Sequence, residues 1–195
     1  SRKNAGADAW AGDSDVLDDI AKTEFVGYTD MKATAKVTAI VKDGARVEAV
    51  ETGDDIVFTL DRTSFYAESG GQVGDTGVIT NDSCTIRVLD TTKNAAGVFI
   101  HKAVVEEGFL REGDTVEAVV DVERRRAIMR NHTAAHLLQA ALRSVLGDHV
   151  EQAGQLVNEN AVRFDFTHFS ALTDEELLAV ENLVNEKILE DLSLI

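Results

Sequence analysis

The hydrophobic pattern of the 195-residue chain changes near residue 122, and this change limits the folds that the chain can adopt. From about Thr23 to Val122, apolar and polar residues alternate, which is typical of strands with one buried face. Beyond this point the apolar residues return every three or four positions, as they do on a helix. Strands are expected at residues 36–41, 45–50, 56–60, 84–89, 97–103 and 115–122.

Turn signals separate these strands, and no helical pattern interrupts them. The signals are Asp43-Gly44, Gly53-Asp54, Asn81-Asp82 and Glu107-Gly108. Six short strands joined by tight turns are typical of a small closed barrel or a sandwich. We take the antiparallel barrel as the prediction for this part of the chain.

The second part of the chain is predicted to form a helix, a hairpin and a second helix. The first helix runs from residue 124 to about Leu146 and stops at Gly147, a common C-terminal signal. Residues 149–157 and 161–166 alternate as two strands, and residues 173–176 form a capping box that opens the last helix. The apolar stripe of the first helix is expected to consist of Ala134, Leu137, Leu138, Ala141 and Val145. The predicted fold class is therefore α+β, a small antiparallel β-barrel followed by a helix–hairpin–helix α/β unit.

Three segments follow from these patterns. Residues 1–22 are expected to be a tail or the end of a preceding helix, and Trp10 is their single large aromatic residue. Residues 23–122 are expected to form the barrel domain, which includes a glycine-rich loop. Residues 123–195 are expected to form the helix–hairpin–helix domain.

Two histidines on the first predicted helix are candidates for metal binding. His132 and His136 lie one turn apart on a face nearly opposite the predicted apolar stripe. Two imidazoles at this spacing can hold one metal ion. The metalloprotease motif with the same spacing needs a glutamate after the first histidine, and Thr133 stands there instead. The alternatives are a solvated helix face, or histidines that are hydrogen-bonded to a neighbouring element.

A second candidate is the glycine-rich segment at residues 60–77. Four glycines in eight residues allow positive φ angles and the close approach of another backbone or a ligand. Successive amides in such a loop can bind a phosphate or carboxylate oxygen. Thr63, Phe65, Tyr66 and Gln72 could line a pocket for a small polar ligand. The alternative is a wide turn at a corner of the barrel.

Charge and composition exclude several function classes. The net charge of −16, from 35 acidic and 19 basic residues, argues against an indiscriminate nucleic-acid binder. One dense basic cluster is formed by Arg124, Arg125, Arg126 and Arg130. No apolar run approaches the roughly 20 residues of a membrane span, and no signal-peptide pattern is present, so no membrane partner is expected. The single cysteine, Cys84, cannot form an internal disulfide, which favours a reducing cytoplasm.

Four motifs, in this order, resemble the editing region of alanyl-tRNA synthetases. They are FYAESGGQVGDTG at residues 65–77, NHTAAHLL at 131–138, HVEQAG at 149–154 and RFDFTH at 163–168. The resemblance runs from about Phe25 to the end of the chain. It implies an aminoacyl-tRNA editing hydrolase that cleaves the ester of a wrongly attached serine or glycine on tRNA(Ala). Its partners would be the acceptor end of tRNA(Ala) and the aminoacylation domain of the same parent chain.

The resemblance also implies roles for individual residues. His132 and His136 match the first half of a zinc site whose other two ligands, a Cys-x-x-x-His pair, are expected beyond Ile195. Thr63 matches the position that senses the serine hydroxyl, and Gln152 matches a pocket residue; both are expected to act in catalysis. Gly70, Gly71 and Gln72, together with Thr63, are expected to bind the substrate. Arg125 and Arg130 are expected to meet the phosphates of the acceptor end.

With only half of the zinc site, this fragment is expected to be inactive. An alternative reading keeps the same fold without catalysis. In that reading the chain is a structural or tRNA-docking module, the histidines serve packing, and the glycine-rich loop is a corner of the barrel.

Overall fold

The computed structural model describes residues 15–17 and 19–190, and the chain divides into two compact units. The barrel unit comprises residues 1–69 and 73–124, and the helical unit comprises residues 70–72 and 125–195. Much of the predicted tail, including Trp10, lies outside the described residues. Within the tail, the short 3-10 helix η2 (Asp15–Leu17) buries Leu17 against Val41, Val57 and Ile100 of the barrel unit.

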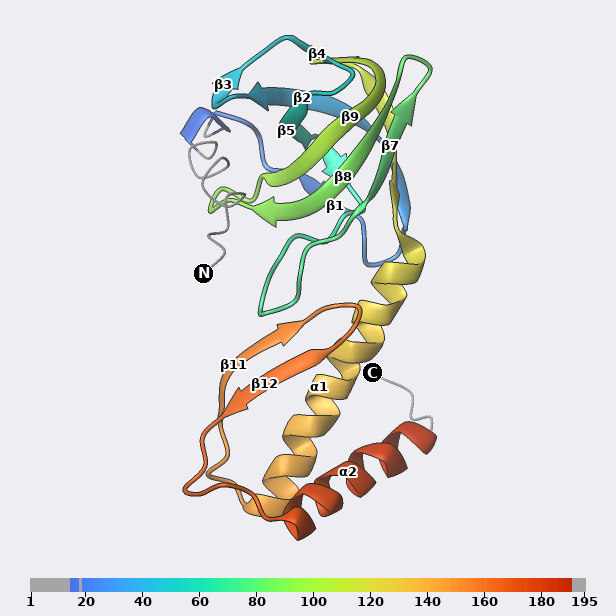
Figure 1. Ribbon diagram of the computed structural model, residues 1–195. Helices are drawn as coiled ribbons and strands as arrows, with labels where there is room; N and C mark the ends of the chain where they lie inside the picture. Colours follow the sequence, from blue (N-terminus) through green and yellow to red (C-terminus); the bar gives the residue numbers. More distant parts are fainter. Residues whose placement is uncertain (1–14, 18, 191–195) are drawn as a thin grey trace. The chain divides into compact units, whose positions relative to one another are not determined.

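Six antiparallel strands close the barrel (Figure 1). Their order is β10-β7-β8-β9-β5-β2, and β10 pairs back with β2, so the sheet has no open edge along this path. The six strands are β2 (Lys32–Lys42), β5 (Asp55–Leu60), β7 (Gly77–Asn81), β8 (Cys84–Lys93), β9 (Phe99–Arg111) and β10 (Thr115–Val120). The predicted small antiparallel barrel is confirmed.

Short strands complete the barrel unit and correct two details of the prediction. Residues 45–50 do not form one strand; β3 (Ala45–Arg46) pairs with β2, and β4 (Ala49–Glu51) pairs with β9. The predicted turn at Glu107-Gly108 lies inside β9. Gly108 has a φ of 81° and pairs with Cys84, so the strand continues through it. The remaining pair, β1 (Glu24–Phe25) and β6 (Arg62–Thr63), is parallel.

The barrel interior is packed with side chains from the inward positions of its strands. Large members with almost no exposure include Ile40, Ile56, Phe58, Leu60, Phe65, Ile79, Ile86 and Leu110. Small barrels of this kind are filled by side chains and enclose no channel. Polar side chains of the barrel unit are fully buried as well, among them Thr63 and His101, whose hydrogen bond is described below.

The helical unit has the predicted helix–hairpin–helix order. It consists of α1 (Val122–Leu146), β11 (Gln152–Val157), β12 (Val162–Phe166) and α2 (Asp174–Leu189). Gly147 ends α1 with a φ of 114°, and its N–H donates to the carbonyl of Arg143. Thr173 caps α2 in a capping box with Glu176.

The two helices and the hairpin share one small core. Ala141, Leu142, Val150 and Val180 are buried in it, and Phe164 and Phe166 of β12 pack against them, so the hairpin lies alongside α1 (Figure 1). Within the described part of the chain, no helix has both the length and the hydropathy needed to cross a membrane.

Candidate functional site

The buried face of α1 is rotated from the stripe that the sequence predicts. Its most buried residues include Ile128, Ala135 and Leu142, which are spaced seven apart. Of the predicted stripe only Ala141 is buried to the same degree, while Leu138 and Val145 pack at the edge of the core. A segment distant in sequence, Gly70–Gln72, belongs to the same unit, and its Gln72 contacts His132 of the helix, a contact that the hydrophobic pattern of the helix alone does not predict.

His132 and His136 lie together on α1, as their spacing predicts. Their rings are stacked, with centroids 5.1 Å apart and planes inclined by 12°. His136 is exposed, whereas His132 is partly buried at the edge of the rotated apolar face. Burial and then the neighbouring His136 lower the pKa of His132, so its neutral form, which binds metals, is favoured.

The glycine-rich loop places three of the predicted residues in the helical unit. The carbonyl of Gly71 accepts a hydrogen bond of 2.8 Å from the N–H of Val157, and Gln72 forms a parallel bridge with Val157. Gly71 has a φ of 84°, and a Cβ added there would lie 2.4 Å from the carbonyl oxygen of Gln155. Only glycine fits this close approach of two backbones.

Gln72 links this loop to the histidine pair. Its side-chain oxygen Oε1 lies 2.6 Å from Nδ1 of His132, although 60 positions separate the two residues. Gln72 is 5% exposed, so the amide lies in a desolvated position. One alternative from the sequence, a histidine hydrogen-bonded to a neighbouring element, therefore describes His132. The bond occupies one ring nitrogen and leaves the other for a ligand.

The donor set fits half of a zinc site. Neutral imidazoles on adjacent turns are suitable zinc ligands, and a ligating histidine usually bonds through its second nitrogen to a fixed acceptor, as His132 does. A structural or catalytic zinc needs at least one further protein ligand. Over residues 15–17 and 19–190, no group of three or more His, Cys, Asp or Glu side chains is arranged to hold a metal. Zinc at His132 and His136 stays a prediction.

Thr63 occupies a different environment, in the core of the barrel unit. Its hydroxyl lies 3.0 Å from Nε2 of His101 and accepts a hydrogen bond from the N–H of Phe65. Nδ1 of His101 lies 3.3 Å from the carbonyl of Phe58. A carbonyl only accepts, so Nδ1 carries the proton and Nε2 accepts from the Thr63 hydroxyl. Burial lowers the pKa of His101 to about 4, which keeps the ring neutral.

Sequence reasoning missed His101. The signal was available, because His101 shares the inward parity of Phe99, Ala103 and Val105 along β9. A histidine at an inward position of a barrel strand must find partners for both ring nitrogens. The proposed serine-sensing role of Thr63 stays a prediction, and a substrate would have to reach a side chain that is now fully enclosed.

The remaining predicted residues differ in exposure. Arg130 is exposed on α1, but Arg125 is only 5% exposed, and Arg124 donates a hydrogen bond of 2.9 Å to the carbonyl of Gly74. Gln152 is exposed at the start of β11, where it pairs with Phe166. Arg130 is therefore accessible to a phosphate in this structure. The phosphate contact of Arg125 and the pocket role of Gln152 stay predictions.

A second histidine pair closes the base of the hairpin. Nε2 of His149 lies 2.9 Å from Nδ1 of His168, and the exposed ring of Phe169 stacks on His149 with centroids 4.4 Å apart. His149 precedes β11 and His168 follows β12, so antiparallel pairing brings them together. The sequence contains this signal, and the expected hairpin could have revealed the pair.

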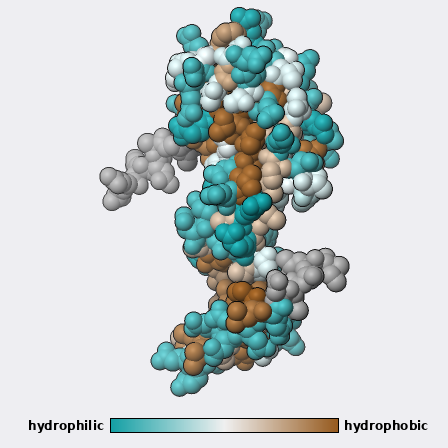
Figure 2. All heavy atoms as spheres, turned by 90° about the vertical axis from the view of Figure 1, so that its right-hand side faces the viewer, coloured by the Kyte–Doolittle hydropathy of each residue, from teal (hydrophilic) through white to brown (hydrophobic). Residues whose placement is uncertain are grey.

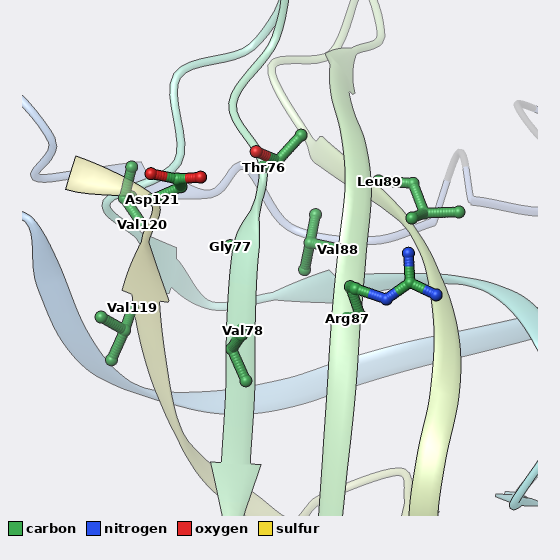
Figure 3. A pocket seen from close by; sticks show the side chains of 9 residues that line it. All are labelled: Thr76, Gly77, Val78, Arg87, Val88, Leu89, Val119, Val120 and Asp121. Atoms are coloured by element: carbon green, nitrogen blue, oxygen red, sulfur yellow. The ribbon is translucent and has the colours of Figure 1, made fainter. Parts of the chain in front are cut away.

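The barrel unit also has a groove on its outer surface, where hydrophobic residues gather (Figure 2). Its volume is about 480 Å³. The residues that line it come from β7, β8, β10 and their ends (Figure 3): Thr76, Gly77, Val78, Arg87, Val88, Leu89, Val119, Val120 and Asp121. No predicted site residue lies among them, so the candidate site remains the Gln72–His132–His136 cluster.

Comparisons with known proteins agree with the resemblance at the level of the family. The family described as tRNA synthetases class II (A) matches residues 1–124. An alanine–tRNA ligase of Acetivibrio thermocellus is 53% identical over 95% of this chain and 21% of its own length. Those of Thermoanaerobacter sp. and Rhodopseudomonas palustris are 51% and 45% identical, over 88% and 97% of this chain and 20% and 22% of their own lengths. The chain thus spans about a fifth of the curated relatives that it matches. It belongs to the alanyl-tRNA synthetase family of class II tRNA synthetases.

Proposed function

We propose that this chain is part of the editing region of an alanyl-tRNA synthetase, which hydrolyses the ester of serine or glycine on tRNA(Ala). The observation that carries the proposal is the stacked pair of His132 and His136, with Gln72 of the Gly-Gly-Gln segment bonded to the first ring. Two motifs that are separated in sequence by the four strands β7 to β10 thus meet in one cluster. The high identity to alanine–tRNA ligases supports the choice of tRNA(Ala).

The residues of the cluster have separable roles in this proposal. His132 and His136 would hold zinc, together with a Cys-x-x-x-His pair that residues 1–195 do not contain. When bound, a zinc ion with an open position supplies Lewis acidity for an ester carbonyl. Gln72 holds the ring of His132, and the exposed Arg130 places a positive charge where acceptor-end phosphates can meet it.

The second candidate is a non-catalytic structural or tRNA-docking module. Two observations favour it for the isolated chain. The Thr63 hydroxyl is already bonded to His101, and no third metal-binding side chain joins the two histidines within the described ranges. A zinc ion with two protein ligands is weakly held. The chain alone is therefore expected to be inactive, while the longer protein carries the activity.

The test compares hydrolysis of serine-charged tRNA(Ala) by the complete synthetase and by two variants. His132→Ala and His136→Ala should each abolish hydrolysis and reduce the zinc content, while alanine attachment by the same protein continues. Arg143→Ala, on an exposed position of the same helix, is the matched control and should keep both properties. Full hydrolysis in both histidine variants would refute the proposal in favour of the docking module.

A further inference from the structure

The hydrogen bond between Gln72 and His132 determines which ring nitrogen carries the proton. The amide oxygen of glutamine has no hydrogen to give, so it can only accept. Its partner Nδ1 of His132, at 2.6 Å, must therefore be the protonated nitrogen. In the neutral ring the lone pair then lies on Nε2, because a neutral imidazole carries one proton. The other tautomer would place two lone pairs against each other.

The backbone holds Gln72 in a fixed place for this bond. Gly71 accepts from the N–H of Val157, and the side-chain amide of Gln155 donates to the carbonyl of Gly70. Gln72 itself bridges Val157 in parallel register. The loop is therefore attached to β11 on both sides of Gly71. Because Gln72 is 5% exposed, water does not readily replace it as the partner of His132.

We propose that Gln72 is the positioning residue of His132: its amide oxygen keeps the proton on Nδ1 and leaves Nε2 as the nitrogen that binds a ligand. The assignment of this tautomer depends only on the geometry of this chain. The binding of a metal by Nε2 of His132 rests on the proposed function. An amide suits this task because it orients the ring and fixes the tautomer without adding a negative charge beside the site, as a carboxylate would.

His136 provides an internal comparison. Its exposed ring stacks on His132, but within the described residues its nitrogens have no hydrogen-bond partner. No protein acceptor among these residues fixes its tautomer. The two histidines should differ in tautomer although they are neighbours on one helix, and this difference is a signature of the bond to Gln72.

Nitrogen-15 NMR of the chain measures the tautomers directly. At a pH about two units above the pKa of an ordinary imidazole, the protonated and unprotonated ring nitrogens have well-separated shifts. His132 should be protonated on Nδ1 almost completely, and His136 should show a mixture. Gln72→Met, which keeps the length of the side chain but removes the acceptor, should shift His132 to the mixture of His136. Gln72→Glu, which keeps an acceptor, should preserve the wild-type tautomer.

A matched control separates positioning from general loosening of the loop. Gln155→Met removes the bond to the Gly70 carbonyl but leaves the Gln72 amide in place, so the His132 tautomer should not change. The proposal is overturned if wild-type His132 carries its proton on Nε2, or if Gln72→Met leaves Nδ1 protonated. If Gln72→Met detaches the loop, the wild-type and Gln72→Glu spectra still test the proposal, because His132 should carry its proton on Nδ1 in both.

Zinc affinity gives a second readout that does not depend on catalysis. Replacing the hydrogen-bond partner of a ligating histidine lowers metal affinity by roughly 10–100-fold. In competition with a chromophoric chelator, Gln72→Met should weaken zinc binding by the complete synthetase about tenfold or more, and Gln155→Met should not. Unchanged affinity in Gln72→Met would overturn the metal-positioning role. A complete synthetase that binds no zinc through His132 would instead refute the proposed function and leave the tautomer result standing.

Discussion

Thr63 and His101 form a hydrogen bond of 3.0 Å inside the barrel unit, and neither side chain is exposed to solvent. Each residue also bonds to the backbone, Thr63 to Phe65 and His101 to Phe58. A short chain of buried polar contacts therefore joins β6, β9 and β5. Thr63, the predicted reader of a substrate hydroxyl, has a structural role as well.

Removing the Thr63 hydroxyl should destabilise the fold. In Thr63→Val the shape is kept, but Nε2 of His101 and the N–H of Phe65 lose their partner, and an unsatisfied buried group costs about 1–3 kcal/mol. Thr63→Ser keeps the hydroxyl and should lose less. Chemical denaturation of the chain measures the difference. A Thr63→Val chain as stable as Thr63→Ser would show that the hydroxyl has no structural role.

The same substitution in the complete synthetase tests the sensing role. If Thr63 reads the serine hydroxyl, Thr63→Val should reduce hydrolysis of the serine ester much more than that of the glycine ester, under conditions where the variant is folded. Steady-state deacylation of the two charged tRNAs measures this. An equal reduction for both esters would leave Thr63 with only its structural role.

The free energy of unfolding should decrease as the pH is lowered, because His101 is buried in its neutral form. The pKa of His101 is lowered from 6.5 to about 4 by burial, so between these values the unfolded chain binds a proton that the folded chain excludes. The loss begins below pH 6.5, grows as the pH falls, and levels off below about 4, reaching about 3 kcal/mol. The unfolding free energy of His101→Gln, measured beside the wild type over this range, should lack this slope. If the unfolding free energies of the wild type and His101→Gln changed in parallel with pH, the slope would not come from His101.

Two adjacent glycines should respond differently to alanine. Gly71→Ala places a Cβ 2.4 Å from the carbonyl of Gln155 at a φ of 84°, so the loop must detach from β11. Gly70 has a φ of 60° and open space around it, so Gly70→Ala should cost only about 1–2 kcal/mol of backbone strain. Amide exchange at Val157, which donates to Gly71, measures detachment. Equal protection in both variants would show that the loop tolerates a side chain.

The rotated core of the helical unit predicts a contrast between two leucines. Leu142 of α1 is 3% exposed and Leu178 of α2 is 57% exposed. Leu142→Ala should lose about 2–5 kcal/mol through the cavity that it leaves. Leu178→Ala, on the solvent side, should change stability by about 0.5 kcal/mol or less. Thermal unfolding of the two variants measures both losses of stability. A loss in Leu178→Ala as large as that in Leu142→Ala would show that Leu178 is packed rather than exposed.

Local signals in the sequence predict much of this fold. Gly147 ends α1 where expected, Thr173 caps α2, and alternation identifies most barrel strands. These features depend on neighbours within a few residues. The strand β7 escapes such reasoning, because its five residues bury only Ile79 and begin with a glycine.

The candidate site depends on contacts between distant residues, and these the sequence does not reveal. The spacing of His132 and His136 indicates a pair, but nothing local indicates that Gln72 bonds to the first ring. The buried face of α1, which includes Ile128 and Ala135, also differs from the stripe that the sequence predicts. For His101, alternation along β9 contains the signal, and only the identity of its partners required the structure.

The helical unit is not encoded by one continuous stretch of sequence. Gly70–Gln72 belongs to it, although the chain then returns to the barrel until Arg124. A gene fragment that starts at Arg125 would encode nearly all of α1, the hairpin and α2, but it would lack Gln72, which bridges Val157 and accepts from His132. In such a fragment His132 would lack its hydrogen bond to Gln72, so its tautomer would differ from that in the longer chain. A stand-alone version must begin before Gly70, or join these three residues to the unit by a new linker.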